Sequence, residues 1–260
     1  MRDGLTDRNF DSLAGRFSQN IYNTTKGKIR QAVLMRDLLE LPQLARPSAL
    51  LDVGGGQGQL ALQLAALGHQ VVLNDISGEM LQIAKTEALA QGLLAQLSFI
   101  QSPLQQLHEQ LAGKNYPLVL CHAVLEWLAD PQAAITALKQ WVAPGGVLSL
   151  MFYNKEAHRF SNILYGNFDY VNADMRVKKP VRLNPQHPLV SNEVLDWCRQ
   201  AGFSLLGKTG VRCFHDYLRD REQQQSHYTE LEALELQYNR QEPYASLGRY
   251  THLLLRAEPI

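Results

Sequence analysis

The sequence has few cysteines, and their spacing excludes two classes of protein. Cys121, Cys198 and Cys213 are the three cysteines among 260 residues, and no two of them form a C-x-x-C pair. A disulfide framework needs a denser set of cysteines, and structural zinc sites commonly use C-x-x-C pairs. We therefore expect buried free thiols in a reducing compartment, with neither a disulfide scaffold nor a metal site.

Long hydrophobic runs and a net charge are also absent. No apolar run approaches the length of a membrane span, and the polar start Met1-Arg2-Asp3-Gly4 lacks the apolar segment of a secretion signal. Lys and Arg total 25, and so do Asp and Glu. Indiscriminate DNA binding needs an excess of positive charge to neutralise phosphates. We therefore expect a cytoplasmic protein that binds neither DNA nor membranes. Net neutrality does not exclude a local basic patch.

The glycines gather after a short apolar run that ends in an acid. Residues 50–58 read Leu-Leu-Asp-Val-Gly-Gly-Gly-Gln-Gly, and the residues that follow lie on and around one helical face: Leu60, Leu62, Leu64, Ala65, Ala66 and Leu67. This pattern indicates a strand, a glycine turn and a helix. Glycines let a ligand approach the backbone closely, and the free N–H groups at the helix start face that ligand. We predict a site for a nucleotide-like ligand.

Two acids at strand ends indicate the charge of that ligand. Asp52 precedes the glycines, and Asp75 ends the next apolar run about 20 residues later, the offset at which a carboxylate can reach a ribose diol. The spacing is D-x-G-x-G-x-G rather than the G-x-G-x-x-G of dinucleotide sites. Asp52 would repel a pyrophosphate in a poorly solvated turn. A cationic ligand suits it better.

The rest of the chain alternates between the two periodicities. Strands are predicted at 48–53, 70–75, 97–100, 117–122 and 147–153, and helices at 29–41, 60–67, 78–91, 104–111 and 135–142, with a tight turn at 144–146. Short connections in this order predict an α/β fold with a parallel sheet and right-handed crossovers. Later come a polar insertion at 154–188 on the ligand edge, helices at 192–201 and 223–238, and two strands at 203–214 and 250–255. We expect a single domain over 1–260, with helices and a loop in 1–45 that cover the site.

The motif order resembles the class I, Rossmann-like methyltransferases that depend on S-adenosylmethionine. The matching segments are 51–58, Asp75, the strand into His122, and 144–146. The resemblance implies a doubly wound, mostly parallel seven-stranded sheet whose late strands form an antiparallel hairpin. It also implies S-adenosylmethionine as cofactor.

The same resemblance implies roles for particular residues in holding the cofactor. The glycine backbone would lie beside its methionine part, Asp75 would bind the ribose hydroxyls, and Arg30 would hold its carboxylate. Met80 would pack against the adenine, with Leu104 and Gln105 at the adenine edge. The full implied set is Arg30, Asp52, Gly54, Gly55, Gly56, Asp75, Met80, Leu104, Gln105 and His122. Without the resemblance, His122 could be a structural histidine, and Met80 and Trp127 could be core residues.

Segments outside these motifs resemble a bacterial family of tRNA-modifying carboxyl methyltransferases over nearly the whole chain. They are 7–10, 20–22, 24–27, 122–127, 167–171, 207–212, 214–219 and 241–244. The resemblance implies methylation of the carboxyl group of 5-carboxymethoxyuridine at the tRNA wobble position, giving the methyl ester, and contact with the anticodon loop. The basic stretch 176–182 and the aromatic residues Tyr165, Phe168 and Tyr170 suit phosphate contact and base stacking, although a solvated loop is the alternative and the family has a denser lysine run there.

Methyl transfer to a carboxylate needs no general base, because the acceptor is already ionised at neutral pH. Catalysis would come mainly from positioning, and we assign no residue as a base. The candidates for positioning the substrate are Tyr22, Lys26, Tyr153 and Arg212. Two alternatives remain open at this point: a small-molecule acid as the methyl acceptor, or a cofactor-binding module without catalysis. The sequence does not indicate an oligomeric state.

Overall fold

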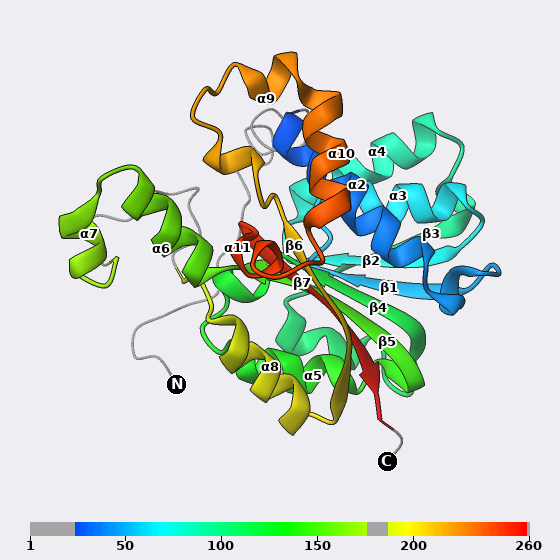
Figure 1. The fold of residues 1–260 in the computed structure, drawn as a ribbon. Coiled ribbons are helices and arrows are strands. Elements are labelled where there is room, and N and C mark those ends of the chain that lie inside the picture. Colours follow the sequence, from blue (N-terminus) through cyan, green and yellow to red (C-terminus); the bar gives the residue numbers. More distant parts are fainter. Residues whose placement is uncertain (1–23, 176–186, 259–260) are drawn as a thin grey trace.

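The computed structural model describes residues 24–175 and 187–258. Tyr22 and the basic stretch 176–182 lie outside the described residues. The described helices are α2 (Thr25–Leu39), α3 (Gln59–Ala66), α4 (Gly78–Ala90), α5 (Pro131–Lys139), α6 (Lys155–Leu164), α7 (Phe168–Asn172), α8 (Ser191–Gln200), α9 (Gln223–Ser226), α10 (Tyr228–Tyr238) and α11 (Tyr244–Leu247) (Figure 1). Within these ranges no helix is long and apolar enough to span a bilayer.

Seven strands form one sheet in the order β3-β2-β1-β4-β5-β7-β6. Their bounds are β1 (Ala49–Val53), β2 (Gln70–Asp75), β3 (Leu97–Gln101), β4 (Tyr116–His122), β5 (Val142–Tyr153), β6 (Phe203–Val211) and β7 (Tyr250–Ala257). The first five strands pair in parallel, and β7 inserts antiparallel between β5 and β6. The predicted doubly wound, mostly parallel sheet with an antiparallel C-terminal hairpin is confirmed.

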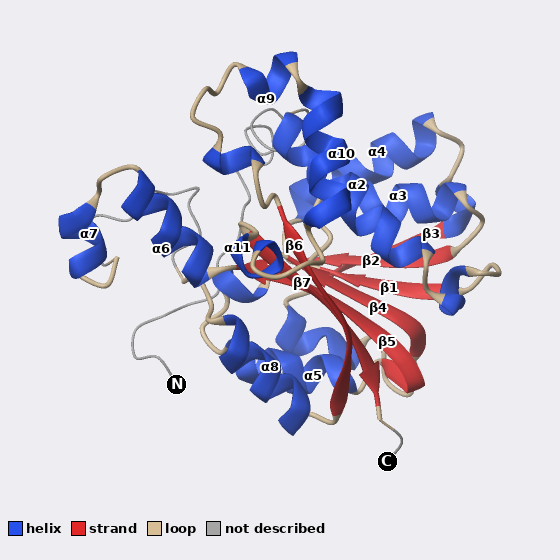
Figure 2. Ribbon diagram, in the orientation of Figure 1, coloured by secondary structure: helices blue, strands red, loops and turns tan. Residues whose placement is uncertain are grey.

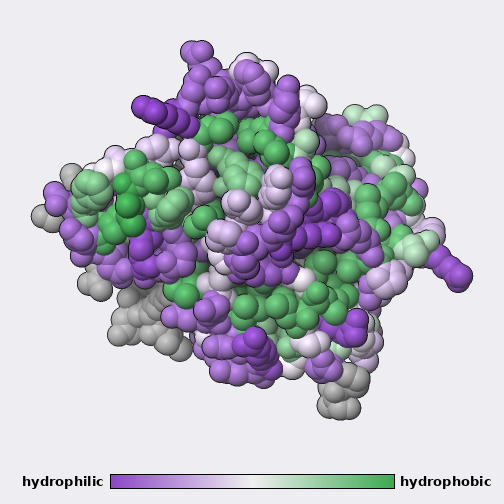
Figure 3. Space-filling view, viewed as in Figure 1, coloured by the Kyte–Doolittle hydropathy of each residue, from purple (hydrophilic) through white to green (hydrophobic). Residues whose placement is uncertain are grey.

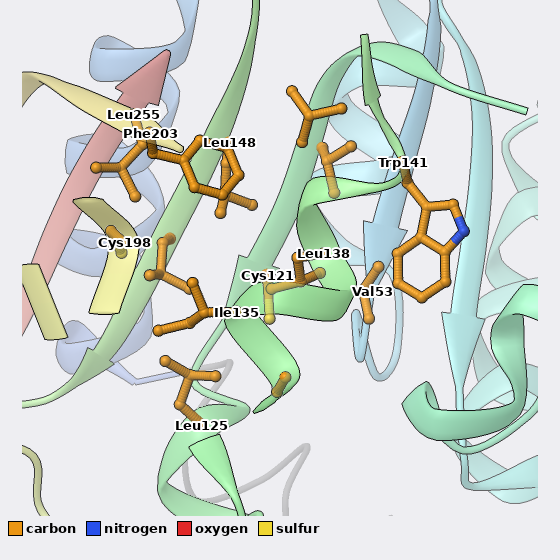
Figure 4. Packing of buried hydrophobic residues seen from close by; sticks show 14 of the residues in the cluster. Val53, Cys121, Leu125, Ile135, Leu138, Trp141, Leu148, Cys198, Phe203 and Leu255 are labelled. Carbon is orange, nitrogen blue, oxygen red and sulfur yellow. The ribbon is translucent and has the colours of Figure 1, made fainter. Parts of the chain in front are cut away.

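Helices cover both faces of this sheet (Figure 2). Alternate strand residues face opposite sides, so Leu50 packs with the core beneath α2, α3 and α4, while its neighbour Leu51 packs with the core beneath α5 and α8. Figure 4 shows the second of these cores, where Ile135 of α5 and Cys198 of α8 lie among buried side chains. All three cysteines are buried and free. Because both faces are covered, the open edge at the carboxyl ends of the parallel strands is left for a ligand.

The structure corrects the predicted start of the N-terminal helix. The helix was predicted to begin at residue 29, yet it begins at Thr25, and Thr24 caps it by accepting a hydrogen bond from the Gly27 backbone N–H at 3.3 Å. A threonine before a polar first turn is a helix-start signal, and the polarity of this stretch concealed it. Arg30 therefore lies in the second turn of α2 rather than in the first.

Several predicted segments further along the chain also differ from the structure. The helix predicted at 135–142 is α5, which ends at Lys139. The strand predicted at 147–153 is β5, which already begins at Val142, where it pairs with Tyr116. The predicted turn at 144–146 therefore lies inside an irregular stretch of β5. The helix at 104–111 is a 3-10 helix over Leu104–Glu109. The helix at 223–238 is broken into α9 and α10 at His227, whose ψ of 35° is not helical.

The insertion at 154–188 carries α6 and α7, which project from the sheet (Figure 1). Hydrophobic side chains gather on its surface (Figure 3). The large exposed ones are Phe160, Ile163, Leu164, Tyr165 and Phe168. The predicted polar insertion therefore also has an apolar face.

Candidate cofactor and acceptor site

The glycine turn between β1 and α3 has a conformation and a tight environment that only glycine fits. Gly54, Gly56 and Gly58 have φ values of +67°, +58° and +70°, in the left-handed region. A Cβ on Gly55 would clash with the Leu73 side chain and lie 2.5 Å from Asp52 Oδ2. The turn therefore offers bare backbone to a ligand, as the sequence predicted.

A cavity lies above this turn, and all ten predicted cofactor-binding residues line it. It is bounded by the carboxyl ends of β1, β2 and β4 and by α2. The ten residues on its wall are Arg30, Asp52, Gly54, Gly55, Gly56, Asp75, Met80, Leu104, Gln105 and His122. They come from segments far apart in the chain, so their meeting at one cavity is a finding of the structure.

Sequence reasoning missed several other lining residues. Those with polar or aromatic side chains are Gln31, Gln59, Asn74, Ser102 and Tyr250. Gln31 follows Arg30 on α2, and Asn74 precedes Asp75 on β2, so proximity to predicted residues could have indicated both. Tyr250 had no such signal, because it reaches the cavity only through the antiparallel insertion of β7.

Asp75 is held in place by backbone groups on both sides. Its Oδ2 accepts a hydrogen bond from the Gly56 N–H at 2.8 Å, and its Oδ1 accepts one from the Ser77 N–H at 2.8 Å. Ser77 in turn caps α4 by accepting from the Met80 N–H. The carboxylate thus joins the glycine turn to the start of α4 and stands fixed at the cavity wall.

Asp52 lies beside Asp75 and is almost fully buried. Burial, together with the negative charge of Asp75, raises the pKa of Asp52 to about 7. Two carboxyl groups so close together repel each other when both are ionised, and a cationic ligand relieves that repulsion. This end of the cavity therefore favours a positively charged ligand.

Arg30 and His122 lie on the cavity wall contributed by α2 and β4. Burial lowers the pKa of His122 well below its ordinary value, and the positive charge of Arg30 acts in the same direction. The next residue, Ala123, has a φ of +59°, an uncommon value for a residue with a side chain. Such strained backbone often accompanies functional sites.

The three described candidates for positioning the substrate, Lys26, Tyr153 and Arg212, do not line this cavity but lie next to it. The Arg212 guanidinium lies 5.5 Å from the ring centre of Tyr250, which is on the cavity wall, and the Arg249 guanidinium lies 4.9 Å from the ring of Tyr153. The two tyrosine rings are themselves 5.5 Å apart. Arg249 has no counterpart in the sequence prediction.

Positive charge exceeds negative charge in this group. Asp216 accepts a hydrogen bond from Arg212 at 2.7 Å and lies 3.8 Å from Arg249. Burial lowers the pKa of Lys26; Asp216 raises it, while Arg212 and Arg249 lower it further. We call Lys26, Arg212, Arg249 and Asp216 the cationic cluster. Two predicted positioning residues, Lys26 and Arg212, belong to this cluster, and a third, Tyr153, packs against Arg249. The fourth, Tyr22, lies outside the described residues.

Comparisons with known proteins agree with this geometry. A family model described as a methyltransferase domain matches residues 51–150. The tRNA 5-carboxymethoxyuridine methyltransferase of Escherichia coli strain K12 is 47% identical over 254 residues, which is 97% of each chain. The ubiquinone biosynthesis O-methyltransferase of Vibrio atlanticus is 34% identical over 138 residues, 53% of this chain and 52% of that one.

Solved structures of low sequence identity share the fold. The magnesium protoporphyrin IX methyltransferase of Synechocystis PCC 6803, with bound SAH, has a TM-score of 0.61 at 15% identity and covers 96% of each chain. An S-adenosylmethionine-dependent methyltransferase from Mesorhizobium loti has a TM-score of 0.56 at 16% identity, covering 90% of this chain and 98% of that one.

The cavity fits S-adenosylmethionine, because its glycine turn leaves space that a Cβ would fill and its buried carboxyl groups suit a cation. The chain therefore belongs to the family of the tRNA 5-carboxymethoxyuridine methyltransferases, enzymes built on a methyltransferase domain that uses S-adenosylmethionine as cofactor.

Proposed function

We propose that this chain transfers a methyl group from S-adenosylmethionine to the carboxylate of 5-carboxymethoxyuridine at the tRNA wobble position, forming the methyl ester. The family membership supports the substrate. The observation in the structure that carries the proposal is the cationic cluster, in which Lys26, Arg212 and Arg249 face the single carboxylate of Asp216 beside the cofactor cavity. A site with surplus positive charge suits an anionic acceptor.

The residues on the cavity wall would hold the cofactor along its length. Asp75 is positioned for the ribose hydroxyls, and Met80, Leu104 and Gln105 for the adenine. Gly54 to Gly56 and Arg30 are left for the methionine part. When bound, the cofactor supplies an electrophilic methyl group on a sulfonium.

The acceptor needs orientation rather than activation. A carboxylate is ionised at neutral pH, so no residue has to remove a proton. Burial raises the pKa of Tyr153 above its ordinary value, so its hydroxyl stays protonated and can act only in hydrogen bonding. Tyr153 Oη and His158 Nδ1 are 2.9 Å apart, and His158 Nε2 lies 3.1 Å from Tyr170 Oη. These two contacts fix the orientation of the Tyr153 side chain.

Asp216 moderates the grip of the cationic cluster on an anion. Negative charge on the acceptor is cancelled as the methyl group is transferred, so a tight ion pair would stabilise the ground state more than the transition state. Asp216 is ionised, because Arg212, the His215 hydrogen bond and Arg249 together outweigh the effect of burial and lower its pKa. Arg212 and Arg249 are therefore partly neutralised before any substrate arrives.

We place the anticodon loop over the insertion and the N-terminal region. On α6 and α7, Tyr165 and Phe168 are more than half exposed, and the Arg221 guanidinium lies 5.5 Å from the Tyr165 ring. Exposed aromatic rings beside arginine suit unstacked bases.

From the N-terminal region, α2 contributes Arg30, Gln31 and Leu34 to the cavity wall, in support of a single domain in which 1–45 covers the site.

A competition assay tests the proposed acceptor. The purified chain is incubated with labelled S-adenosylmethionine and tRNA that carries 5-carboxymethoxyuridine, with and without an excess of the free nucleoside. We expect label in the tRNA, undiminished by the free nucleoside. Labelling of the nucleoside in preference to the tRNA would favour a small-molecule acid as acceptor, and cofactor binding without any transfer would indicate a non-catalytic module.

A further inference from the structure

A row of buried polar side chains crosses the sheet from α2 to the cofactor cavity. His252 Nδ1 on β7 lies 2.8 Å from Asp37 Oδ2 on α2, and His252 Nε2 lies 2.8 Å from Ser149 Oγ on β5. Ser149 Oγ also lies 2.8 Å from His122 Nε2, at the end of β4. Asp37, Ser149 and His252 are at most 1% exposed. Buried polar groups have few partners to choose from, so the direction of each hydrogen bond can be worked out.

The direction is set at Asp37. Burial opposes its ionisation, but the His252 hydrogen bond and the nearby charges outweigh burial and lower the pKa of Asp37. Arg36 and Arg240 reach its Oδ1 at 2.7 and 2.6 Å. An ionised carboxylate only accepts hydrogen bonds, so His252 Nδ1 carries a proton and donates it to Asp37.

The remaining hydrogen bonds follow in order. Two guanidinium groups already balance Asp37, and a further buried cation would be costly, so His252 is neutral and its Nε2 accepts from the Ser149 hydroxyl. The Ser149 oxygen then accepts from His122 Nε2–H. His122 is also neutral, which leaves its Nδ1 without a proton. That atom has no hydrogen-bond partner among the residues that the structure describes.

We propose that Asp37, His252 and Ser149 are positioning residues that hold His122 as the Nε2–H tautomer, so that its bare Nδ1 accepts a hydrogen bond from the α-ammonium group of the cofactor. The second half of this inference rests on the proposed cofactor site, in which Arg30, on the same wall, takes the neighbouring carboxylate. The opposite tautomer would set an N–H donor against an ammonium donor. Asp37, His252 and Ser149 do not touch the ligand, yet they determine which tautomer of His122 faces it.

The tautomer is measurable without any ligand. Nitrogen-15 NMR of histidine-labelled protein distinguishes the two ring nitrogens, and the His122 signals are assigned from a His122→Gln spectrum. We expect the Nε2–H tautomer in the wild type and a mixture of tautomers in Ser149→Ala. A wild-type His122 protonated on Nδ1, or an unchanged tautomer in Ser149→Ala, would overturn the inference.

Thr251→Val is the matched control, because it also removes one buried hydroxyl. Thr251 lies on β7 next to His252, and its Oγ1 is 2.9 Å from Ser191 Oγ, outside the row. We expect this variant to leave the His122 signals unchanged. If it alters them as strongly as Ser149→Ala does, loss of packing rather than the hydrogen-bonded row sets the tautomer, and the inference fails.

Ligand binding tests the contact with the ammonium group. S-adenosylhomocysteine carries that group, whereas 5′-methylthioadenosine lacks the amino-acid part. We expect Ser149→Ala to weaken S-adenosylhomocysteine in proportion to the loss of the Nε2–H tautomer, about twofold for an equal mixture, and to leave methylthioadenosine unchanged. Equal losses for both ligands, or none, would refute the contact. If the wild type binds neither ligand, the proposed cofactor site itself is wrong and the contact falls with it, while the NMR result still decides the tautomer.

Discussion

At the scale of single residues, two neighbouring carboxyl groups have different environments. Asp75 accepts hydrogen bonds from the N–H groups of Gly56 and Ser77, whereas Asp52 is buried beside it with a raised pKa. Hydrogen bonds to a carboxylate favour its ionised form, and burial disfavours it. Asp75 is therefore the permanent acceptor in the cavity, and Asp52 is the group that responds to the charge of a ligand.

Replacing Asp75 with asparagine is expected to weaken cofactor binding. Hydrogen bonds to a charged group are worth about 1.5–3 kcal/mol, so the loss of one corresponds to roughly a 10- to 150-fold lower affinity by calorimetry. Asp130→Asn is the matched control, because asparagine can still cap α5 as Asp130 does through the Ala133 N–H. Unchanged affinity in Asp75→Asn would remove Asp75 from the site.

The pH dependence of cofactor binding follows from Asp52. Its pKa is raised to about 7 in the free protein, and only its ionised form attracts the cation. Affinity for S-adenosylmethionine should therefore rise as the pH increases through about 7, by at most about tenfold per pH unit, since one proton is released. Asp52→Asn should bind with a flatter pH profile. A wild-type affinity that falls over this range would contradict the assignment.

At the scale of elements, the glycine turn is fixed by both its backbone and its packing, and the two contributions can be separated. Gly58 and Gly92 both have a φ of +70°, but a Cβ on Gly58 would meet the Leu73 and Ala84 side chains at 2.8 and 3.3 Å, whereas one on Gly92 would meet nothing within 4 Å. Gly92 thus measures the backbone cost alone.

Alanine at each position should give different losses of stability. Gly92→Ala should lower the free energy of unfolding by about 1–2 kcal/mol, the cost of a left-handed residue with a Cβ. Gly58→Ala should cost about 1–3 kcal/mol more through overpacking. Urea unfolding of both variants measures the difference, and equal losses would show that the turn has room for a side chain.

The three cations of the cationic cluster come from segments far apart in the chain. Lys26 lies on α2, Arg212 follows β6, and Arg249 precedes β7. Lys26→Met should raise the KM for tRNA and leave cofactor affinity unchanged, since the lysine lies outside the cofactor cavity. Lys114→Met, at an exposed position, is the control for loss of one charge. A Lys26→Met enzyme with wild-type KM would exclude this lysine from acceptor binding.

Element boundaries were predictable where periodicity and punctuation agreed. The strand before the glycine turn and α4 closely follow their expected ranges. The start of α2 was missed, because Thr24 to Gly27 has the composition of a loop but is a capped first turn. The start of β5 was missed because Val142 fits the helical pattern of the preceding residues, and only its pairing with Tyr116 shows that it is a strand residue.

At the scale of the whole molecule, the sequence predicted the cofactor cavity but not the row behind it. Strand ends of a parallel sheet meet at one edge, so Asp52, Asp75 and His122 could be placed together. The antiparallel insertion of β7 between β5 and β6 brings His252 beside Ser149 and Tyr250 beside Arg212. Ser149 and His252 are about 100 residues apart in the chain, and Arg212 and Tyr250 are about 40 apart. Both contacts depend on how the late strands pair, and local sequence patterns carry no information about that pairing.

The most direct test of the central claim is the position of the transferred methyl group. The chain is incubated with isotopically labelled S-adenosylmethionine and tRNA containing 5-carboxymethoxyuridine, and the nucleosides are analysed by mass spectrometry before and after mild alkali. We predict a single labelled methyl group on that nucleoside, which alkali removes because the product is an ester. A labelled methyl group that resists alkali, or a 5-carboxymethoxyuridine without label, would contradict the assignment of a carboxylate acceptor.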